Sequence, residues 1–152
     1  MYEIVPAKLD HAIELGSRMR QADIDEVFAS HGISPSFAAT AAFSRSQEPM
    51  TGLADGNVVC MFGVEQAHIM SDFGHPWLLG TDLVDQHARA FLPRSKVAFE
   101  EMREGYSYLT NYADVRNRKA LRWLRWLGFE MSAPARWGFL NMPFQKFWWG
   151  RA

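Results

Sequence analysis

Residues 117–129 read NRKALRWLRWLGF and form the most characteristic stretch of this sequence. Their apolar side chains recur at positions i, i+3, i+4 and i+7, the spacing of one buried helix face: Ala120, Trp123, Leu124 and Leu127. Gly128 follows where a residue in the left-handed conformation commonly ends a helix. We therefore expect a helix here, and the preceding residues 108–115 predict a strand.

The segments toward the N-terminus add one strand and three helices. Residues 2–5 predict a short strand that Pro6 ends. Residues 12–19 and 24–31 each repeat apolar side chains with the helical period, and Gly32 lies where the second of these helices should end. Ser34 precedes a proline, which is the pattern of a helix cap, so we expect a third helix from there to about residue 43.

A hairpin signal lies in the middle of the chain. Asp55 and Gly56 separate two apolar runs and supply the positive φ angles of a two-residue turn. After the hairpin we expect a strand at residues 77–80, a polar stretch, and a helix over residues 93–106 that starts at Pro93. The C-terminal part again predicts strands. This order of elements indicates an α+β fold, a mixed sheet with helices on its faces.

The 152 residues suit a single globular domain, residues 1–152, because no repeat, low-complexity tract or linker divides them. The formal charge is -1, from 16 Lys and Arg against 17 Asp and Glu, which argues against nucleic acid as a partner. No run approaches the ~20 apolar residues of a membrane-spanning helix, and the N-terminus lacks the apolar core of a secretory signal. With Cys60 as the single cysteine, we expect a soluble protein of a reducing, cytoplasmic compartment.

Residues 117–129 resemble the C-terminal motif of the GNAT superfamily of N-acetyltransferases, N-x-x-A-x-x-x-Y-x-x-x-G-F. Four of the five fixed positions match, at Asn117, Ala120, Gly128 and Phe129. The order of elements along the whole chain is similar to that superfamily as well. The resemblance implies a mixed, mostly antiparallel sheet flanked by helices on both faces. It also implies a site for acetyl-CoA or another acyl-CoA where the strands at residues 77–80 and 108–115 splay apart.

The pyrophosphate loop of that superfamily, R/Q-x-x-G-x-G/A, has no match, since no glycine lies between Gly80 and Gly105. The best substitute is the predicted helix start at Pro93, where two cations, a hydroxyl and the helix dipole could receive a phosphate. The predicted cofactor-binding residues are therefore Arg94, Ser95, Lys96, Asn117 and Ala120. The alternative is that Arg94 and Lys96 are ordinary solvated charges.

The catalytic residues stay unknown from the sequence. The superfamily motif places a tyrosine at the position of Leu124, as the acid that protonates the CoA thiolate, and leucine has no proton to give. Nearby substitutes for this acid are Tyr106, Tyr108 and Tyr112. Candidate bases, each also explained as a solvated or hydrogen-bonded side chain, are Glu65, Asp82, Asp85, His75 and His87. The five histidines lack the spacing of zinc ligands, so we expect no metal site.

Further segments resemble phage and prophage GNAT-like proteins, which are related to an internal virion protein of short-tailed phages. These segments are HPWLLGTD at residues 75–82, NYADVRN at 111–117, RWLRWLGF at 122–129 and MPFQKF at 142–147. The resemblance implies a viral protein, located in the cytoplasm of a bacterial host or in the virion. It leaves open whether the protein is an enzyme.

Two features bear on protein partners. Five cations lie within ten residues: Arg116, Arg118, Lys119, Arg122 and Arg125. They form a solvated helix face, a docking ridge for an acidic partner or nucleic acid, or a contact for the 3′-phosphate of CoA. Aromatic residues crowd residues 137–149, either as final strands on the sheet or as an interface for a homo-oligomer or virion proteins. Three functions therefore stay open: an acyl-CoA-dependent N-acyltransferase, an inactive virion or head-assembly protein, and a host-directed binding module.

Overall fold

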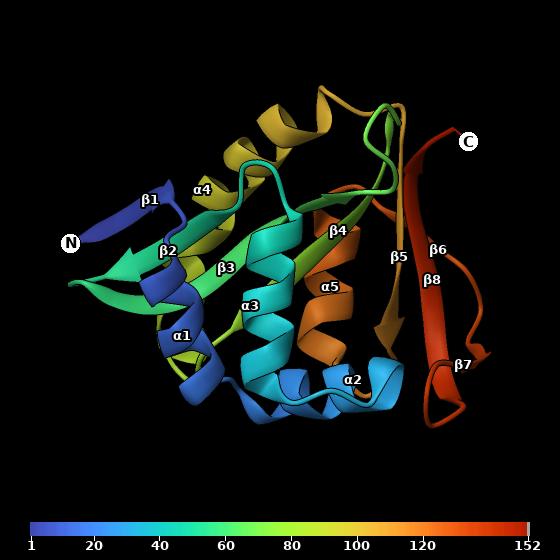
Figure 1. Ribbon diagram of the computed structural model, residues 1–152, viewed down its shortest axis with the longest axis horizontal. Coiled ribbons are helices and arrows are strands. Elements are labelled where there is room, and N and C mark those ends of the chain that lie inside the picture. The colour runs from blue at the N-terminus through green and yellow to red at the C-terminus, as the bar shows by residue number, and fades with distance from the viewer. Residues whose placement is uncertain (152) are drawn as a thin grey trace.

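The structure is a computed structural model that describes residues 1–151. Its strands are β1 (Tyr2–Pro6), β2 (Met50–Ala54), β3 (Asn57–Gln66), β4 (Phe73–Gly80), β5 (Tyr108–Asp114), β6 (Glu130–Met131), β7 (Ala135–Trp137) and β8 (Met142–Gly150). Its helices are α1 (Leu9–Ser17), α2 (Gln21–His31), α3 (Pro35–Arg45), α4 (Val84–Arg103) and α5 (Arg118–Trp126). The strands form a sheet in the order β1-β2-β3-β4-β5-β8-β6, with β7 also beside β8 (Figure 1).

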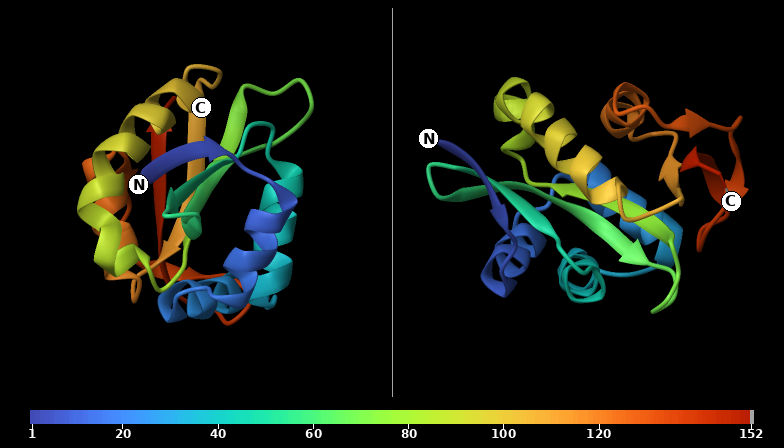
Figure 2. Two further views of the ribbon diagram at one scale, coloured as in Figure 1. Left: turned by 90° about the vertical axis from the view of Figure 1, so that its left-hand side faces the viewer. Right: turned by 90° about the horizontal axis from the view of Figure 1, so that it is seen from above.

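The sheet separates two layers of helices. Helices α1, α2 and α3 lie between β1 and β2 in the chain and cover one face, whereas α4 and α5 cover the other face (Figure 2). Neighbouring strands are antiparallel except for β4 and β5. The expected fold class is confirmed: an α+β fold with a mixed, mostly antiparallel sheet and helices on both faces.

Several local predictions are confirmed by the backbone. The Ser34 hydroxyl accepts the Phe37 N–H at 3.2 Å and so caps α3. Gly32 ends α2 with a φ of 68°. Asp55 and Gly56 turn the β2–β3 hairpin with φ angles of 49° and 82°, the positive values that such a turn requires.

The prediction that a helix begins at Pro93 is wrong. Helix α4 begins at Val84, and Pro93 lies inside it. A proline in a helix interior removes one backbone hydrogen bond, which is why it suggested a helix start. The turns before Pro93 are nevertheless helical because Val84 and Phe91 are buried against the sheet. The expected polar stretch is therefore mostly the first half of α4.

Strands β4 and β5 touch only at one end. They are parallel and pair at Phe73 with Tyr108 and at Gly74 with Leu109. Beyond these pairs the two strands diverge toward their C-terminal ends (Figure 1). The other edge of β4 pairs with β3 as far as Gly80. Most of the β4 edge that faces β5 therefore has no strand partner.

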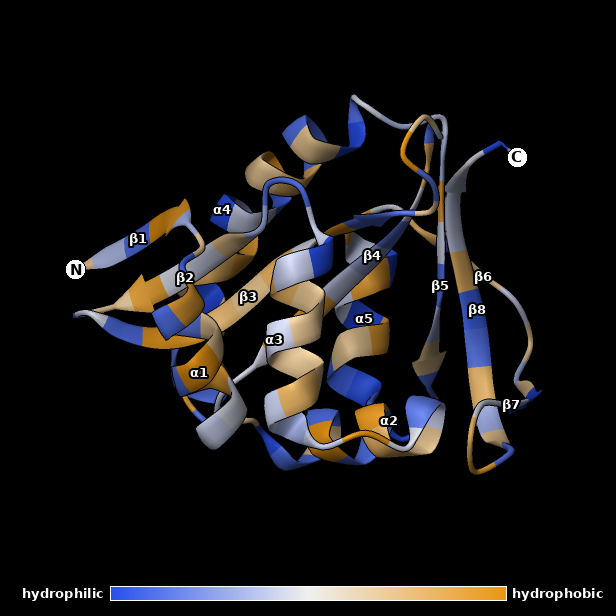
Figure 3. Ribbon diagram, viewed as in Figure 1, coloured by the Kyte–Doolittle hydropathy of each residue, from blue (hydrophilic) through white to orange (hydrophobic). Residues whose placement is uncertain are grey.

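The core lies on both faces of the central strands. Strand β3 is hydrophobic along most of its length (Figure 3), and Val58, Val59 and Met61 are at most 1% exposed. None of the helices in residues 1–151 combines the length and the hydropathy that crossing a bilayer requires.

Strand β8 is an interior strand, because β5 pairs with one of its edges and β6 and β7 pair with the other. Phe144 and Phe147 are buried, and Trp148 and Trp149 are half-buried. The C-terminal aromatics thus belong to the sheet, as one of the two interpretations expected. Their use as an interface stays a prediction.

Candidate functional site

A cavity of about 600 Å³ opens where β4 and β5 diverge. On one face of the sheet, α2 and α3 line it with Glu26 and Ala42. On the other face, α4 and α5 line it with Ser95 and Leu124. The cavity therefore reaches both helical layers through the gap in the sheet.

The end of the cavity at α2 is built on the buried carboxylate of Asp23. Its Oδ2 accepts the Gly80 backbone N–H at 2.8 Å, and its Oδ1 accepts from Arg20 Nη1 at 3.0 Å. The Arg20 backbone N–H donates in turn to the Gly80 carbonyl at 2.9 Å. Burial raises the pKa of Asp23, and the charge of Arg20 opposes that rise. These bonds fix α2 to the end of β4 beside the gap.

Asn117 connects Asp23 to the start of α5. Its Nδ2 donates to Asp23 Oδ1 at 2.9 Å and to Glu26 Oε1 at 3.1 Å, and its Oδ1 accepts from Arg20 Nη1 at 3.1 Å. The Asn117 side chain is 1% exposed. Asn117 therefore acts on the cavity through the two carboxyl groups, and a direct contact with CoA stays a prediction.

Glu26 is the carboxyl at this end of the cavity that no cation neutralises among residues 1–151. Asp23 is paired with Arg20, and Asp114 binds Arg116 Nη2 at 2.6 Å. Glu26 accepts from the Asn117 amide instead. Burial, with the negative charges of Asp23 and Asp114, raises the pKa of Glu26 to about 8. Such a carboxyl can exchange a proton near neutral pH.

The opposite end of the cavity, beside β3 and β4, carries Arg45, Glu65 and His75. Glu65 lies directly opposite His75 in the β3–β4 ladder. Burial raises the pKa of Glu65, and the charge of Arg45 opposes that rise. The Nδ1 of His75 lies 2.9 Å from the Thr110 carbonyl. Because a carbonyl only accepts, Nδ1 carries the proton, and Nε2 is the acceptor in the neutral ring.

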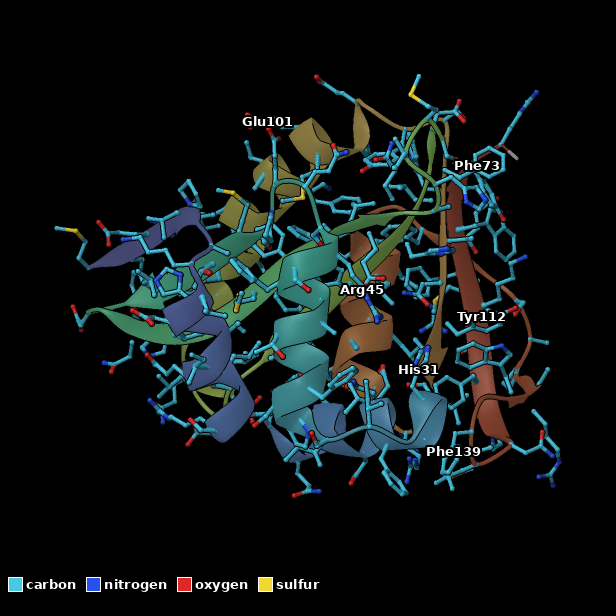
Figure 4. The ribbon with its side chains drawn as sticks, in the orientation of Figure 1. His31, Arg45, Phe73, Glu101, Tyr112 and Phe139 are labelled. Atoms are coloured by element: carbon cyan, nitrogen blue, oxygen red, sulfur yellow. The ribbon has the colours of Figure 1, made fainter. Side chains whose placement is uncertain are left out.

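An aromatic wall closes the side of the cavity. Tyr112 on β5 stacks on Trp137 at a centroid distance of 4.0 Å, and His31 meets Trp137 edge-on at 5.9 Å. Lys146, the β8 partner of Tyr112, lines the cavity as well. Figure 4 shows His31, Arg45 and Tyr112 around the space between α2, α3 and β5. This wall therefore places two further basic side chains, His31 and Lys146, beside the cavity.

The predicted catalytic candidates divide into two groups. Those that line the cavity are Tyr112, Glu65 and His75. Those that the structure places elsewhere are Tyr106, Tyr108, Asp82, Asp85 and His87. His87, for example, contacts the Tyr2 hydroxyl at 3.1 Å, beside β1. The structure therefore favours Tyr112 among the tyrosines and His75 between the two histidines.

The structure does not bring Arg94, Ser95 and Lys96 to a helix start. They lie in the middle of α4 and face three different neighbours. Arg94 Cζ is 5.8 Å from the ring centroid of Tyr2, Lys96 Nζ is 4.6 Å from that of Trp126, and Ser95 lines the cavity. The helix dipole therefore cannot assist these residues, and their contact with CoA stays a prediction.

The actual start of α4 offers few groups for phosphate. Thr81 is buried, and its hydroxyl donates to the Val58 carbonyl at 2.8 Å. Two exposed acids follow, Asp82 and Asp85, which are paired with Arg18 and Lys119. Acidic side chains and the absence of glycine both disfavour a pyrophosphate at a helix N-terminus. This end of the site does not fit the nucleotide part of CoA.

The free edge of β4 fits an extended, amide-bearing chain better. The Thr81 N–H bonds to the Val59 carbonyl of β3, so the alternate residues Gly80 and Leu78 direct their backbone groups toward the gap. Gly80 is bonded to α2, which leaves Leu78. Trp123 Nε1 is buried without a hydrogen-bond partner among residues 1–151, and Trp123 lines the cavity beside Ala120. A chain with amide groups could bond to both places.

Several solved structures with this architecture are acetyltransferases. A GNAT-family acetyltransferase from Streptococcus pneumoniae superposes with a TM-score of 0.66 over 98% of both chains, at 12% identity. The ribosomal-protein-S18-alanine N-acetyltransferase of Escherichia coli gives 0.62 over 97% of this chain and 91% of that chain, at 15% identity. The ribosomal-protein-S5-alanine acetyltransferase of Vibrio fischeri gives 0.66 over 97% and 92%, at 11% identity. This chain has the GNAT fold. No family model and no curated protein matches its sequence.

Within the GNAT fold, the motif helix lies where the sequence places it. It is α5, and Gly128 follows it with a φ of 102°. Leu124 is half-buried in the cavity wall, as expected, and packs against the core cluster that contains Phe129 and Phe147. The motif's tyrosine position therefore supplies no proton to the cavity.

Asp23 and Glu26 are the site residues that sequence reasoning missed. They share one face of α2 with Val27 and Ser30, at positions i, i+3, i+4 and i+7, and all four line the cavity. Two carboxylates three positions apart, on the same helix face as the apolar Val27, were therefore a visible signal. Their partner Asn117 lies more than 90 positions away, so local patterns could not indicate the network.

Proposed function

We propose that this protein is an N-acyltransferase, in which an acyl thioester and an amine meet in the cavity between β4 and β5. One observation carries the proposal: the cavity passes through the sheet from the α4–α5 layer to the α2–α3 layer and holds Glu26 at one end. A thioester and an amine can therefore approach each other from opposite faces of the sheet. Several structural neighbours are acetyltransferases, which supports the same reaction.

Glu26 supplies the base for this reaction. An amine is mostly protonated at neutral pH and attacks a carbonyl carbon only after it has lost a proton. Glu26 takes that proton, because its pKa of about 8 makes it a stronger base than an ordinary carboxylate. The amine nitrogen then bonds to the acyl carbon as the carbon–sulfur bond breaks. The sulfur leaves with the electron pair, as a thiolate that Tyr112 or water protonates.

The acyl donor fits the site in part. Acyl-CoA would supply the activated acyl group, and the Leu78 backbone, Trp123 and Ala120 would hold its arm. Its phosphates have no cradle at the start of α4, where Asp82 and Asp85 lie. Arg94 and Lys96 face away from each other, which leaves Ser95 and Ala120 as predicted cofactor residues on the cavity wall.

The test is thiol release from acetyl-CoA in the presence of a panel of primary amines, with mass spectrometry of the products. We expect amine-dependent release, reduced about 100-fold or more in Glu26→Gln, since a general base contributes factors of this size. Glu101→Gln is the matched control, because Glu101 is exposed on α4 away from the cavity (Figure 4). Equal rates of thiol release in the two variants would show that Glu26 is not the base of this reaction.

The acidic start of α4 and Leu124 favour a second candidate, a protein that keeps the fold without the reaction. The phage resemblance would make it a virion or head-assembly protein, located in the virion or the host cytoplasm. Neither acetyl-CoA turnover nor a rise in melting temperature with acetyl-CoA is then expected. At 100 times its dissociation constant, a bound ligand would add about 2.7 kcal/mol to the free energy of unfolding.

A further inference from the structure

We propose that the cavity takes an amphoteric ligand, with an ammonium group at the α2 end, an anionic group at the β3–β4 end, and an apolar chain between them. This inference names the class of amine that would accept the acyl group. Only the acylation of the ligand, and not its binding, rests on the proposed function. The binding itself follows from the charges that the chain places at the two ends.

The α2 end carries one carboxyl in excess of its cations. Asp23 is paired with Arg20 and Asp114 with Arg116, whereas Glu26 has only the Asn117 amide as a side-chain partner. Asn117 is buried, and its donors are already shared between the two carboxyl groups. An ammonium group of a ligand would favour the ionised form of Glu26 over the protonated form and supply the donors that this carboxylate lacks.

The β3–β4 end and the adjoining wall carry the opposite excess. Arg45 and Lys146 line the cavity, and neither forms an ion pair within residues 1–151. Glu65 is the carboxyl that lines this end, and the rings of His31 and His75 add two more polar groups. Arg45 at this end and Lys146, which lies opposite Tyr112 midway along β5, together outnumber the one carboxyl, so an anionic group of a ligand is favoured on this side of the cavity.

The two ends are separated along the strands. His75 bonds to the Thr110 carbonyl, and Glu26 is held at the other end of β5, beside Asp114. Thr110 and Asp114 are four positions apart on β5, which corresponds to a distance of about 13 Å along the strand. Allowing for the reach of the side chains, the two charges of the ligand lie roughly 10 Å apart. An α-amino acid is too short to satisfy both ends.

The wall between the two ends is mostly apolar. It includes the small side chains of α3 and larger ones from β4, β8 and α5: Ala38, Ala41, Ala42, Leu78, Leu124 and Phe147. An unbranched aliphatic chain or a flat ring system would bury its surface here. A ligand with charges along its middle, such as a polyamine, would have to leave them unpaired.

The experiment is calorimetric titration of the whole chain with 8-aminooctanoate, octylamine, octanoate and 4-aminobutanoate, with no acyl donor present. We expect 8-aminooctanoate to bind at least tenfold more tightly than each of the other three compounds. In Glu26→Gln its affinity should fall to that of octanoate, and in Arg45→Gln/Lys146→Gln to that of octylamine. Arg122→Gln, an exposed arginine of α5, is the control and should leave all affinities unchanged.

Octylamine binding as tightly as 8-aminooctanoate would overturn the inference, and so would an unchanged preference in Arg45→Gln/Lys146→Gln. Circular dichroism and melting curves show that each variant is folded before it is titrated. Because no acyl donor is present, the result is independent of acyl transfer. Tight binding of 8-aminooctanoate without its acetylation by acetyl-CoA would support the ligand class and contradict the proposed acyl transfer. Equal acetylation of all amines would support acyl transfer and contradict the ligand class.

Discussion

Asn117 and Asp23 are 94 positions apart in the sequence, and their side chains are joined by a hydrogen bond of 2.9 Å under the floor of the cavity. The same Asn117 amide nitrogen also reaches Glu26. One neutral side chain thus holds two carboxyl groups that would otherwise repel each other. It joins α5 to α2 at the point where the sheet is open.

Replacing Asn117 with alanine should therefore lower stability strongly. The change leaves Asp23 and Glu26 buried with fewer donors, and loss of a partner at a buried charged group costs about 2 to 4 kcal/mol. Urea unfolding measures this loss. Gln86→Ala, an exposed change on α4, is the control and should stay within about 0.5 kcal/mol of the parent. Equal stability of the two variants would mean that the network is not coupled to folding.

Stability should fall as pH rises from about 5.5 to 8.5. The pKa of Glu26 is about 8 in the folded chain and near 4.5 when unfolded, so the folded state binds the extra proton between these values. Stability is then highest at the acidic end, decreases toward pH 8 and levels off above it. The loss is at most about 3 kcal/mol over this range.

Melting curves of Glu26→Gln provide the check, because the variant should lose much of this dependence. Asp23, Asp114, Arg20 and Arg116 face Glu26 in the folded chain and are present in both proteins. The raised pKa values of Asp23 and Glu65 add a pH dependence of the same sign, which remains in the variant. If the variant keeps the full pH dependence of the parent, then Asp23 and Glu65, and not Glu26, cause the loss of stability with pH.

Arg94→Ala/Lys96→Ala should leave the affinity for acetyl-CoA within about twofold, because the two side chains lie against Tyr2 and Trp126 and cannot share a phosphate. Lys119→Ala should also leave this affinity within about twofold, because Asp82 and Asp85 leave the start of α4 without a cradle for phosphate. The shift of the melting temperature with acetyl-CoA measures both variants. If the double variant instead binds acetyl-CoA tenfold or more weakly than the parent, the phosphates bind at the middle of α4.

The sequence predicted the elements whose signals are local. The Asp55–Gly56 turn, the Ser34 cap and the glycine stops of α2 and α5 each depend on a few adjacent residues. The start of α4 was missed because Pro93 imitates a helix start, whereas the burial of Phe91 that keeps the preceding turns helical is a tertiary effect. The site was found in part for the same reason: Tyr112 and His75 were visible candidates, but the pairing of Asn117 with α2 depends on the folded chain.

Trp148→Ser/Trp149→Ser tests the proposed interface at the C-terminus. Both indoles are half-buried on an interior strand, and Trp149 packs against the core and lies under Arg103, 4.8 Å from its guanidinium carbon. Burial of such a side chain contributes about 1.5 to 3 kcal/mol, so we expect the double variant to lose several kcal/mol of stability.

The measurements for this variant are urea unfolding and sedimentation of both proteins at high concentration. Trp126→Ser is the matched control, because Trp126 is 44% exposed at the end of α5. Its loss should cost less than half as much. If instead the double variant keeps the stability of the parent while a dimer of the parent disappears, the two indoles form an interface. An assembly role would then have direct support, because aromatics that the dimer needs and the folded chain does not are typical of an interface core.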